Sequence, residues 1–233
     1  MRYCGVVPAG GGLQIAVLQE LRTEEPPVRL TAAFYEPGSA EQVAAEVGGF
    51  GDAVIGVGAP LSDPAGGPER ACDAMIAERG VAPRPRDAEP RRLGDALASR
   101  GMFLPVAEGP QGPVAEGTFR EAPVFETHPD AIFCALQARR LPARRHPLGV
   151  RMRIDELLED HVIDDGGELW HRRIEEVEAA AVALCAHRYA VGHACWLGDP
   201  AEAVIVLPGS AVPGRFATEG VMPAVERLEL PRR

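Results

Sequence analysis

The segment from residue 52 to residue 73 constrains the fold of this chain most, because an apolar strand there runs directly into a polar loop. The apolar run covers Ala53–Val57, and a Gly-Ala-Pro break at residues 58–60 ends it. The loop that follows leads to Arg70 and Asp73. Open α/β sheets place their chemistry at the carboxyl ends of buried strands. The run therefore predicts a core strand, and the loop predicts a functional site.

The segments on either side of this strand predict a mixed sheet. Three strand-like segments come first: Arg2–Val7, Leu13–Leu18 and Val28–Tyr35. Helical segments and further strands then alternate. We expect helices over residues 39–48, 69–79, 93–100, 130–140, 154–158 and 168–190, and later strands over 123–126 and 203–207. This order predicts an α/β fold with a three-stranded antiparallel start, in which helices cover both faces of one mixed sheet.

The glycine run at residues 10–12 has two interpretations. It lies between two expected strands, where glycines usually form a hairpin turn. Glycines of this kind also cradle phosphate groups, but they then stand between a strand and a helix. No helix is expected directly after this run, so we favour the turn.

Length and composition predict a single domain over residues 1–233, with a loop-rich excursion over 81–117 and a wrapping tail over 208–233. No apolar run approaches the length that crosses a membrane, and the opening segment is too short for a secretory signal. Five scattered cysteines without a CxxC pair indicate reduced, buried thiols. We therefore expect a cytoplasmic protein with no membrane partner.

The charge pattern excludes several classes of function. A net charge of −10 does not favour a nucleic-acid partner, because nonspecific binding draws on clustered cations. All 24 basic residues are arginine, so Walker-type phosphate loops and lysine-dependent enzymes are excluded. Arginines are dense only over residues 139–153. That stretch is either a phosphate-facing surface or a solvated face paired with acids at 156–160, and both interpretations stay open.

Four phrases of the sequence, in this order and with these gaps, resemble the motifs of one protein family. They are Val57-Gly58-Ala59-Pro60-Leu61, Gly67-Pro68-Glu69-Arg70-Ala71-Cys72-Asp73, Phe125-Glu126-Thr127-His128-Pro129 and Glu175-Glu176-Val177-Glu178-Ala179. The family is the bacterial and archaeal domain of unknown function 429, whose members are predicted to be ribonuclease H-like nucleases. The likeness covers residues 3–208. It implies a ribonuclease H-like fold and a hydrolase that uses Mg²⁺ or Mn²⁺.

The resemblance also implies roles for the acids that match the motifs. Glu126, Glu175 and Glu178 correspond to metal ligands, and the catalytic set would be Glu126, Glu178 and Asp73. Two further acids of the family pattern are replaced, one by Val7 on the first strand and one by Gly58 after the central strand. A pair of Mg²⁺ ions needs oxygen ligands in near-octahedral geometry. Val7 offers no oxygen from its side chain, so the family's metal centre is incomplete.

Three basic side chains match positions that the resemblance links to substrate binding: Arg70, His128 and Arg153. Arg70 could contact a phosphate, or it could pair with the remaining glutamates without any metal, which we favour. His128 is either a proton shuttle or a packed imidazole. Whether Asp63 or Asp73 replaces the missing acids stays open.

Two other groups of residues are weaker candidates for a functional site. Cys185, His187, His193 and Cys195 offer four zinc-type ligands, but their spacing fits no common zinc pattern, and buried thiols are the simpler expectation. Ser62 follows the central strand without a GxSxG context, so a nucleophile elbow is not expected.

Two functions remain after these exclusions. The first is a divergent, catalytically degenerate family member that binds a ligand or a partner protein. The alternative is a metal-dependent nuclease that cleaves phosphodiester bonds through a reduced Glu126, Glu175 and Glu178 site with Mg²⁺ or Mn²⁺. The loss of acids at Val7 and Gly58 favours the first function. A sugar kinase or ATPase would also need an acid at Val7. Homo-oligomers are compatible with both functions.

Overall fold

A computed structural model describes residues 1–24, 28–102, 112–113, 124–211 and 213–216. Its main feature is a six-stranded mixed sheet with the strand order β6-β4-β1-β2-β3-β7. The strands are β1 (Arg2–Ala9), β2 (Gly12–Arg22), β3 (Val28–Phe34), β4 (Ala53–Val57), β6 (Val124–Glu126) and β7 (Val162–Asp164). The prediction of an α/β fold with a mixed sheet is confirmed.

The first three strands form an antiparallel meander, and the later strands add to it in parallel. β1 pairs with β2, and β2 pairs with β3, both antiparallel. β4 lies parallel to β1, β6 lies parallel to β4, and β7 lies parallel to β3. Gly10 and Gly11 have φ of 55° and 92° and join β1 to β2 by a two-residue turn. Such turns need positive φ at both central residues, so the glycines serve the hairpin.

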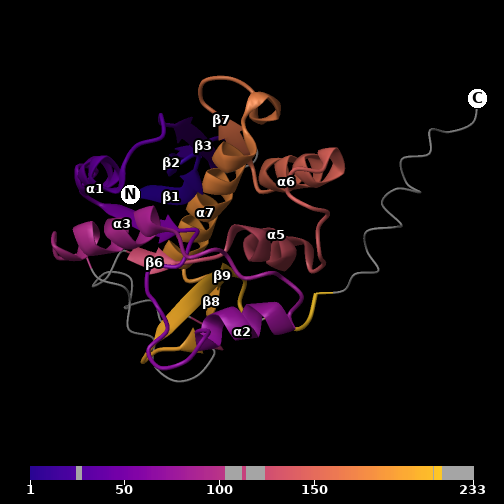
Figure 1. Ribbon diagram of the computed structural model, residues 1–233. Helices are drawn as coiled ribbons and strands as arrows, with labels where there is room; N and C mark the ends of the chain where they lie inside the picture. Colours follow the sequence, from indigo (N-terminus) through magenta and orange to yellow (C-terminus); the bar gives the residue numbers. More distant parts are fainter. Residues whose placement is uncertain (25–27, 103–111, 114–123, 212, 217–233) are drawn as a thin grey trace, which may run out of the picture.

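Helices cover both faces of the sheet (Figure 1). α7 lies along one face, and α1 and α3 cover the other. Cys4 and Val6 of β1 belong to the core below α1 and α3, whereas Tyr3 and Val7 belong to the core below α7. The helices are α1 (Ala40–Gly48), α2 (Ala71–Glu78), α3 (Ala88–Ala98), α5 (Pro129–Gln137), α6 (Pro147–Glu159), α7 (Ile174–Ala190) and a short 3₁₀ helix η1 (Leu169–His171).

Small residues let α7 approach the sheet closely. A Cβ atom at Gly5 of β1 would collide with the backbone of Ala179 and Ala183. A Cβ at Gly56 of β4 would lie 2.8 Å from Val182. Every α7 residue from Glu176 to His187 is buried, so this helix is apolar nearly all round apart from its first turns. The glycines and the alanine-rich helix therefore form one packing arrangement.

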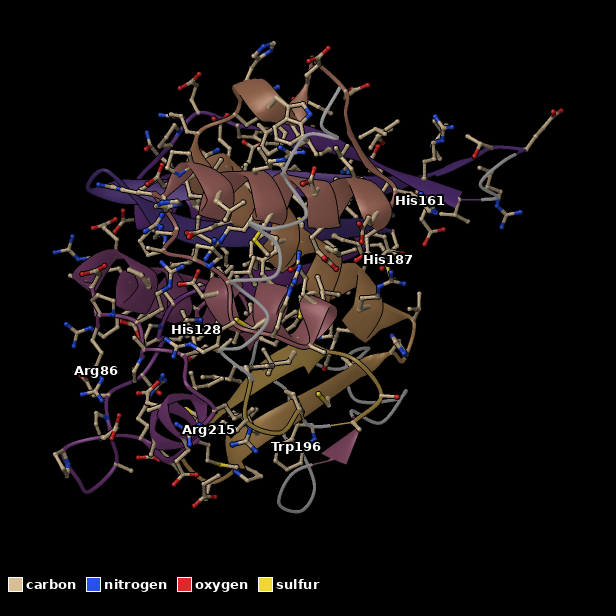
Figure 2. All side chains as sticks on the ribbon, turned by 90° about the vertical axis from the view of Figure 1, so that its right-hand side faces the viewer. Arg86, His128, His161, His187, Trp196 and Arg215 are labelled. Atoms are coloured by element: carbon tan, nitrogen blue, oxygen red, sulfur yellow. The ribbon has the colours of Figure 1, made fainter. Side chains whose placement is uncertain are left out.

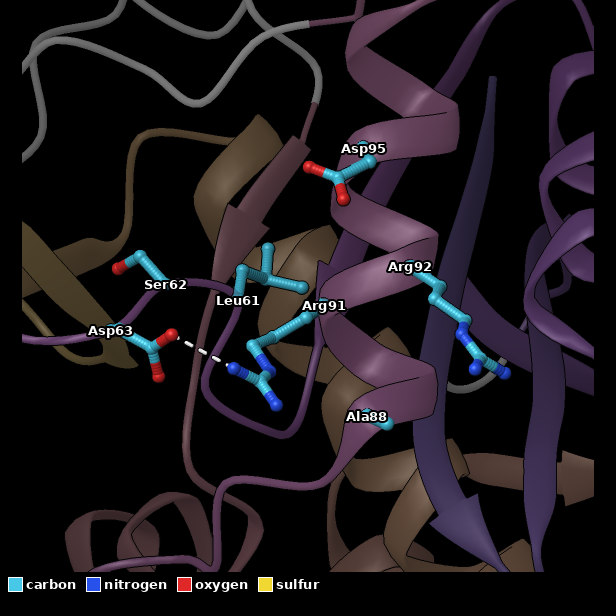
Figure 3. A pocket seen from close by; sticks show the side chains of 7 residues that line it. All are labelled: Leu61, Ser62, Asp63, Ala88, Arg91, Arg92 and Asp95. Carbon is cyan, nitrogen blue, oxygen red and sulfur yellow. Dashed lines mark hydrogen bonds and ion pairs between the residues drawn. The ribbon is translucent and has the colours of Figure 1, made fainter.

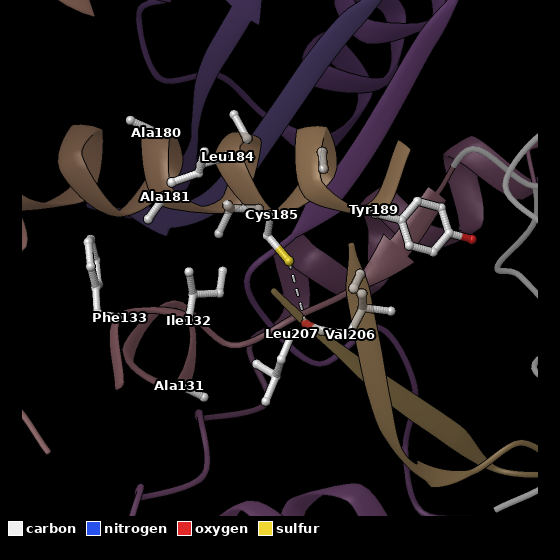
Figure 4. Close-up of a cluster of buried hydrophobic side chains, with 14 of the residues drawn as sticks. Ala131, Ile132, Phe133, Ala180, Ala181, Leu184, Cys185, Tyr189, Val206 and Leu207 are labelled. Carbon is white, nitrogen blue, oxygen red and sulfur yellow. Dashed lines mark hydrogen bonds between the residues drawn. The ribbon is translucent and has the colours of Figure 1, made fainter. Parts of the chain in front are cut away.

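A second sheet of three strands packs against α2, α5 and α7. Its order is β5-β8-β9, with β5 (Gly112–Pro113), β8 (Ala194–Asp199) and β9 (Ala203–Pro208). Figure 4 shows Val206 and Leu207 of β9 against Cys185 and Tyr189 of α7. Thr127, directly after β6, forms a parallel bridge with Val206, so the two sheets meet at that point.

Several predicted boundaries were wrong. α3 begins at Ala88 and α6 at Pro147, well before the predicted starts, because in each a proline stands in the first helical turn, where its missing N–H costs nothing. α7 begins at Ile174 rather than residue 168, and η1 precedes it. β7 and β8 were not predicted. Three residues are too few for a periodic signal, and the apolar run of β8 directly follows a helix.

Of the predicted excursion over 81–117, residues 103–111 and 114–117 lie outside the described residues, as does most of the predicted tail over 208–233. Within the described ranges, no helix combines the length and the apolar character that crossing a lipid bilayer requires.

Candidate functional site

The carboxyl ends of β1, β4 and β6 meet at one edge of the main sheet. The Gly58 N–H donates to the Val6 carbonyl at 2.7 Å, and the Thr127 N–H donates to the Val57 carbonyl at 2.9 Å. These bonds align Val7, Gly58 and Glu126, which are the three strand positions that the resemblance linked to metal ligands. Of the three, only Glu126 carries an acid.

The space beside Gly58 is filled by apolar side chains. A Cβ atom at Gly58 would lie 2.7 Å from Pro129 Cγ and 2.9 Å from Val7 Cγ1. Val7 is fully buried in the core below α7. The two replaced positions, Val7 and Gly58, therefore pack against each other. Apolar side chains fill the space that the missing acid would occupy.

Glu126 belongs to a buried ion cluster, which we call the Arg70 cluster: Arg70, Asp73, Arg86 and Glu126. Arg70 donates to both oxygens of Glu126, at 2.9 Å from Nη1 and 2.6 Å from Nη2. It donates to both oxygens of Asp73 as well, at 2.9 Å from Nε and from Nη2. The Leu61 N–H also donates to Glu126, at 3.0 Å. Arg86 adds a weaker contact with Asp73 at 3.5 Å. Every guanidinium nitrogen of Arg70 thus has an acceptor.

The electrostatics of the Arg70 cluster keep its charges in place. Burial would lower the pKa of Arg70, but its hydrogen bonds with Asp73 and Glu126 outweigh burial, so the pKa is raised and the proton stays. Burial also raises the pKa of Asp73, yet Arg70 and Arg86 outweigh it and the net shift is downward. For Glu126 burial is the largest effect and raises the pKa, against the opposing effect of Arg70. Two arginines and two acids give a cluster without net charge.

A second group of charged side chains gathers around the first turns of α7. We call it the Glu178 cluster, and its members are Arg84, Asp130, Arg144, Glu175 and Glu178. The fully buried Glu178 lies 2.8 Å from Arg144 Nε and 3.1 Å from Arg84 Nη2. Arg144 also reaches Glu175 at 3.2 Å, and Arg84 Nη2 lies 3.8 Å from Asp130. The two glutamates share one arginine, as their i, i+3 spacing on the helix predicts.

Hydrogen bonding in the Glu178 cluster is incomplete. Neither oxygen of Glu178 has a hydrogen bond of good geometry, and the same is true of Arg84 Nε, Arg84 Nη2 and Arg144 Nε. Burial raises the pKa of Glu178, and the two nearby arginines oppose that shift without cancelling it. The two arginines therefore act on Glu178 mainly through their charge.

Residues 81–87, which we call the strap, connect the two clusters. Arg84 belongs to the Glu178 cluster and Arg86 to the Arg70 cluster, and Val81 is buried in the core. The Ala82 carbonyl lies 2.9 Å from His128 Nε2. The strap therefore lies over the carboxyl edge of the sheet.

His128 (labelled in Figure 2) is a buried capping residue. Its Nδ1 accepts from the Ala131 N–H at the start of α5, so Nε2 carries the proton that binds Ala82. Burial, with the nearby Arg84 as a second cause, lowers the pKa of His128 to about 4. His128 is therefore neutral near pH 7, as the packed-imidazole interpretation requires.

The other predicted substrate contacts are also inside the protein. Arg70 has no exposed surface, and Arg153 is 3% exposed. Arg153 donates to Asp130 at 2.6 Å and to the carbonyls of Gly149 and Pro142. In this structure Arg70, His128 and Arg153 hold the fold together. Their polar atoms bind protein groups, and their role as substrate contacts stays a prediction.

A pair of Mg²⁺ ions does not fit this edge. The family position at Gly58 is filled by Pro129 and Val7, and Glu126 is bound on both oxygens by Arg70. Glu126, Glu175 and Glu178 do not converge: the first lies in the Arg70 cluster, and the other two lie in the Glu178 cluster. Cys72, Asp73 and Glu126 have ligand atoms within 4.8 Å of one another, but both acids already pair with Arg70.

A cavity of about 500 Å³ opens beside the loop after β4 (Figure 3). Its lining comes from that loop and from α3: Leu61, Ser62, Asp63, Ala88, Arg91, Arg92 and Asp95. Asp63 pairs with Arg91 at 2.8 Å, so it does not replace a missing acid. Asp73 does not either, because Arg70 binds it. The cavity is thus lined in part by the loop that the sequence indicated.

The cysteines do not form a zinc site with the neighbouring histidines in the described part of the chain. Cys185 and Cys195 are buried, and each thiol donates to a carbonyl of β9. Burial raises the pKa of Cys195 to about 11, so the thiol stays protonated. His187 packs edge-on against Tyr3 instead.

The sequence did not indicate that Arg84, Arg86 and Arg144 belong to the site. A signal was present for the first two: they stand two residues apart in a Pro-Arg-Pro-Arg segment, and residues two apart in an extended chain lie on the same side. Asp130 likewise follows the Glu126 motif directly.

Comparison of the chain with protein-family models, with curated proteins and with solved structures found no match.

Proposed function

We propose that this chain is a divergent ribonuclease H-like protein that binds a ligand or a partner without metal-dependent nuclease activity. The fold assignment draws support from the strand order β3-β2-β1-β4-β6, with an antiparallel start and two parallel additions. That order is the plan of the ribonuclease H-like sheet, and the motif resemblance points to the same family.

The observation that carries the functional proposal is the closed position beside Gly58. Phosphodiester cleavage by two metals needs ligands on the central strands. Here Pro129 and Val7 occupy the place of one such ligand, and Val7 replaces another. The protein therefore keeps the strands that position the family site and lacks the acids that would bind its metal ions.

We place the binding role at the cavity of Figure 3, because it opens at the carboxyl end of the central strand, where open α/β sheets bind ligands. Two arginines and two aspartates line it, and Asp95 has no ion-pair partner among the described residues. A small polar ligand with groups of both charges suits this lining. Ser62→Trp would fill the cavity and should abolish such binding.

The proposal is tested by a calorimetric titration with Mg²⁺ and Mn²⁺ and a nuclease assay on single-stranded and double-stranded substrates. We expect no saturable metal binding and no cleavage above background. Metal-dependent cleavage that Glu126→Gln abolishes, and that the control Glu159→Gln leaves intact, would establish the alternative nuclease instead.

A further inference from the structure

Residues 213–216, which we call the clasp, contact the end of α2 directly before the strap. Arg79 is the C-cap residue of α2 and stands two residues before the strap begins. Its Nε donates to the Pro213 carbonyl at 2.8 Å, and its own carbonyl accepts from the Phe216 N–H at 3.1 Å. The clasp therefore binds both the side chain and the backbone of Arg79.

Phe216 adds an apolar anchor to these two hydrogen bonds. It is 4% exposed and belongs to the core below α7. The same core contains Ile76 of α2 and Val81, the first residue of the strap. The neighbouring Arg215, labelled in Figure 2, is exposed. Buried aromatic side chains dominate the energetics of small contacts, so Phe216 fixes the position of the clasp.

The strap makes few strong contacts of its own. It contains no helix or strand, and four of its seven residues are exposed: Ala82, Pro83, Pro85 and Asp87. Two nitrogens of Arg84 have no hydrogen bond of good geometry, and Arg86 lies 3.5 Å from Asp73. Segments with few buried apolar contacts open at a low cost in free energy. The position of the strap therefore depends on how its two ends are held.

We infer that the clasp holds the strap closed over the carboxyl edge of the main sheet, and that release of the clasp opens the strap. Pro83 and Pro85 keep the strap extended, because proline fixes its own φ and disfavours a helical conformation in the residue before it. Such a stiff segment moves as a unit when one end is freed. The other end stays in place, since α3 buries Leu93 and Leu97.

Opening of the strap would expose groups that it now covers. The Ala82 carbonyl lies 2.9 Å from His128 Nε2, and Arg84 lies 3.1 Å from the fully buried Glu178. Both His128 and Glu178 would then meet solvent. The clasp thus controls access to the carboxyl edge from outside both clusters. This control does not depend on which ligand the protein binds, so it stands or falls separately from the proposed function.

The test is limited proteolysis of the full chain with trypsin, which cleaves after arginine unless proline follows. Arg84 precedes Pro85, so the strap offers one cleavable bond, between Arg86 and Asp87. The bond after Arg188, within α7, reports opening of the whole fold instead. Mass spectrometry measures the rates of cleavage at both bonds in the same sample.

We expect Phe216→Ala to speed cleavage after Arg86 about tenfold, because loss of the anchor raises the population of the open strap. The rate of cleavage after Arg188 should not change. Phe216→Leu keeps an apolar anchor and should come close to the unaltered protein, and the control Arg215→Ala should equal it. Equal acceleration at both bonds in Phe216→Ala, or acceleration at neither, overturns the inference.

A second variant keeps the inference falsifiable if Phe216→Ala fails to fold. Arg79→Met removes the hydrogen bond to Pro213 and leaves Phe216 in place. Nuclear magnetic resonance of the imidazole should then show the pKa of His128 rising from about 4 toward its ordinary value of about 6.5, since opening relieves its burial. An unchanged pKa of His128 together with unchanged cleavage after Arg86 would contradict the inference, and the clasp would then only wrap the domain.

Discussion

The Arg70 cluster and the Glu178 cluster both bring arginines and carboxylates to the carboxyl edge of the sheet, but they are built differently. Arg70 makes two-pronged hydrogen bonds to Asp73 and Glu126, and every nitrogen has an acceptor. Glu178 lies close to Arg84 and Arg144 without good hydrogen-bond geometry. A two-pronged pair combines charge with fixed geometry. The first cluster therefore fixes the relative positions of its side chains, whereas the second relies mainly on charge.

The largest effect should come from Arg70→Met. It leaves Asp73 and Glu126 buried without their counter-ion, which typically costs about 3–5 kcal/mol. Urea unfolding would measure the loss. Arg86→Met is the control, because Arg86 is more exposed and its contact is longer, so its loss should be within about 1 kcal/mol. Equal losses of unfolding free energy in Arg70→Met and Arg86→Met would mean that the two arginines contribute equally to stability.

The next largest loss of stability should come from lowering the pH. The residue responsible is His128, which binds the strap that contributes one arginine to each cluster. Burial lowers the pKa of His128 to about 4, below the value of about 6.5 in an unfolded chain. The unfolded chain then binds more protons, so this contribution is complete above pH ~6.5 and is lost as the pH falls toward 4. At about 1.4 kcal/mol per pKa unit, protonation of His128 should lower the free energy of unfolding by about 3 kcal/mol across this pH range.

Urea unfolding at several pH values across this window would measure the effect. His128→Asn keeps an acceptor at the start of α5 but cannot take up a proton. This variant should therefore lose less stability between pH 6.5 and 4 than the unaltered protein. Parallel losses in both proteins would assign the acid sensitivity to other groups.

Gly58→Asp should destabilise the protein by about 1–3 kcal/mol, the usual cost of overpacking. The new side chain would meet Pro129 and Val7, and restoring the family acid should not create a metal site. Gly66→Asp is the matched control, since open space surrounds Gly66. Thermal unfolding with and without Mn²⁺ checks both points. A stable Gly58→Asp protein that Mn²⁺ stabilises further would contradict the closed site.

The smallest effect should come from Glu178→Gln, within about 1 kcal/mol, because no well-formed hydrogen bond is lost and a buried charge is removed. Arg84 and Arg144 keep Asp130 and Glu175 as partners. Glu126→Gln, its counterpart in the Arg70 cluster, should cost several times more. Chemical denaturation of both variants gives the two losses of unfolding free energy. Equal losses would mean that the clusters do not differ.

The sequence predicted the frame of this molecule better than its site. The hairpin strands and the central strand follow from apolar patterning and turn glycines. β8 was missed because its apolar residues directly follow the longest helix. The Arg70–Glu126 pair was expected, since both residues stand in recognisable motifs and one is a buried acid that needs a partner.

The Glu178 cluster could not be derived in the same way. Arg84 lies in a proline-rich segment without periodic pattern, and nothing local indicates that it reaches Glu178 on a helix about ninety residues later. The closed position beside Gly58 also depends on Pro129, which is the first residue of α5. Both features arise from tertiary packing between distant segments.

The central claim is that arginines and packed apolar side chains, rather than metal ions, complete the carboxyl edge of the sheet. A crystal of the unaltered protein soaked in MnCl₂ and measured at a wavelength where manganese scatters anomalously tests it most directly. We expect no anomalous peak at Glu126 or Glu178. A peak at coordination distance from either carboxylate, with Arg70 or Arg84 displaced, would contradict it.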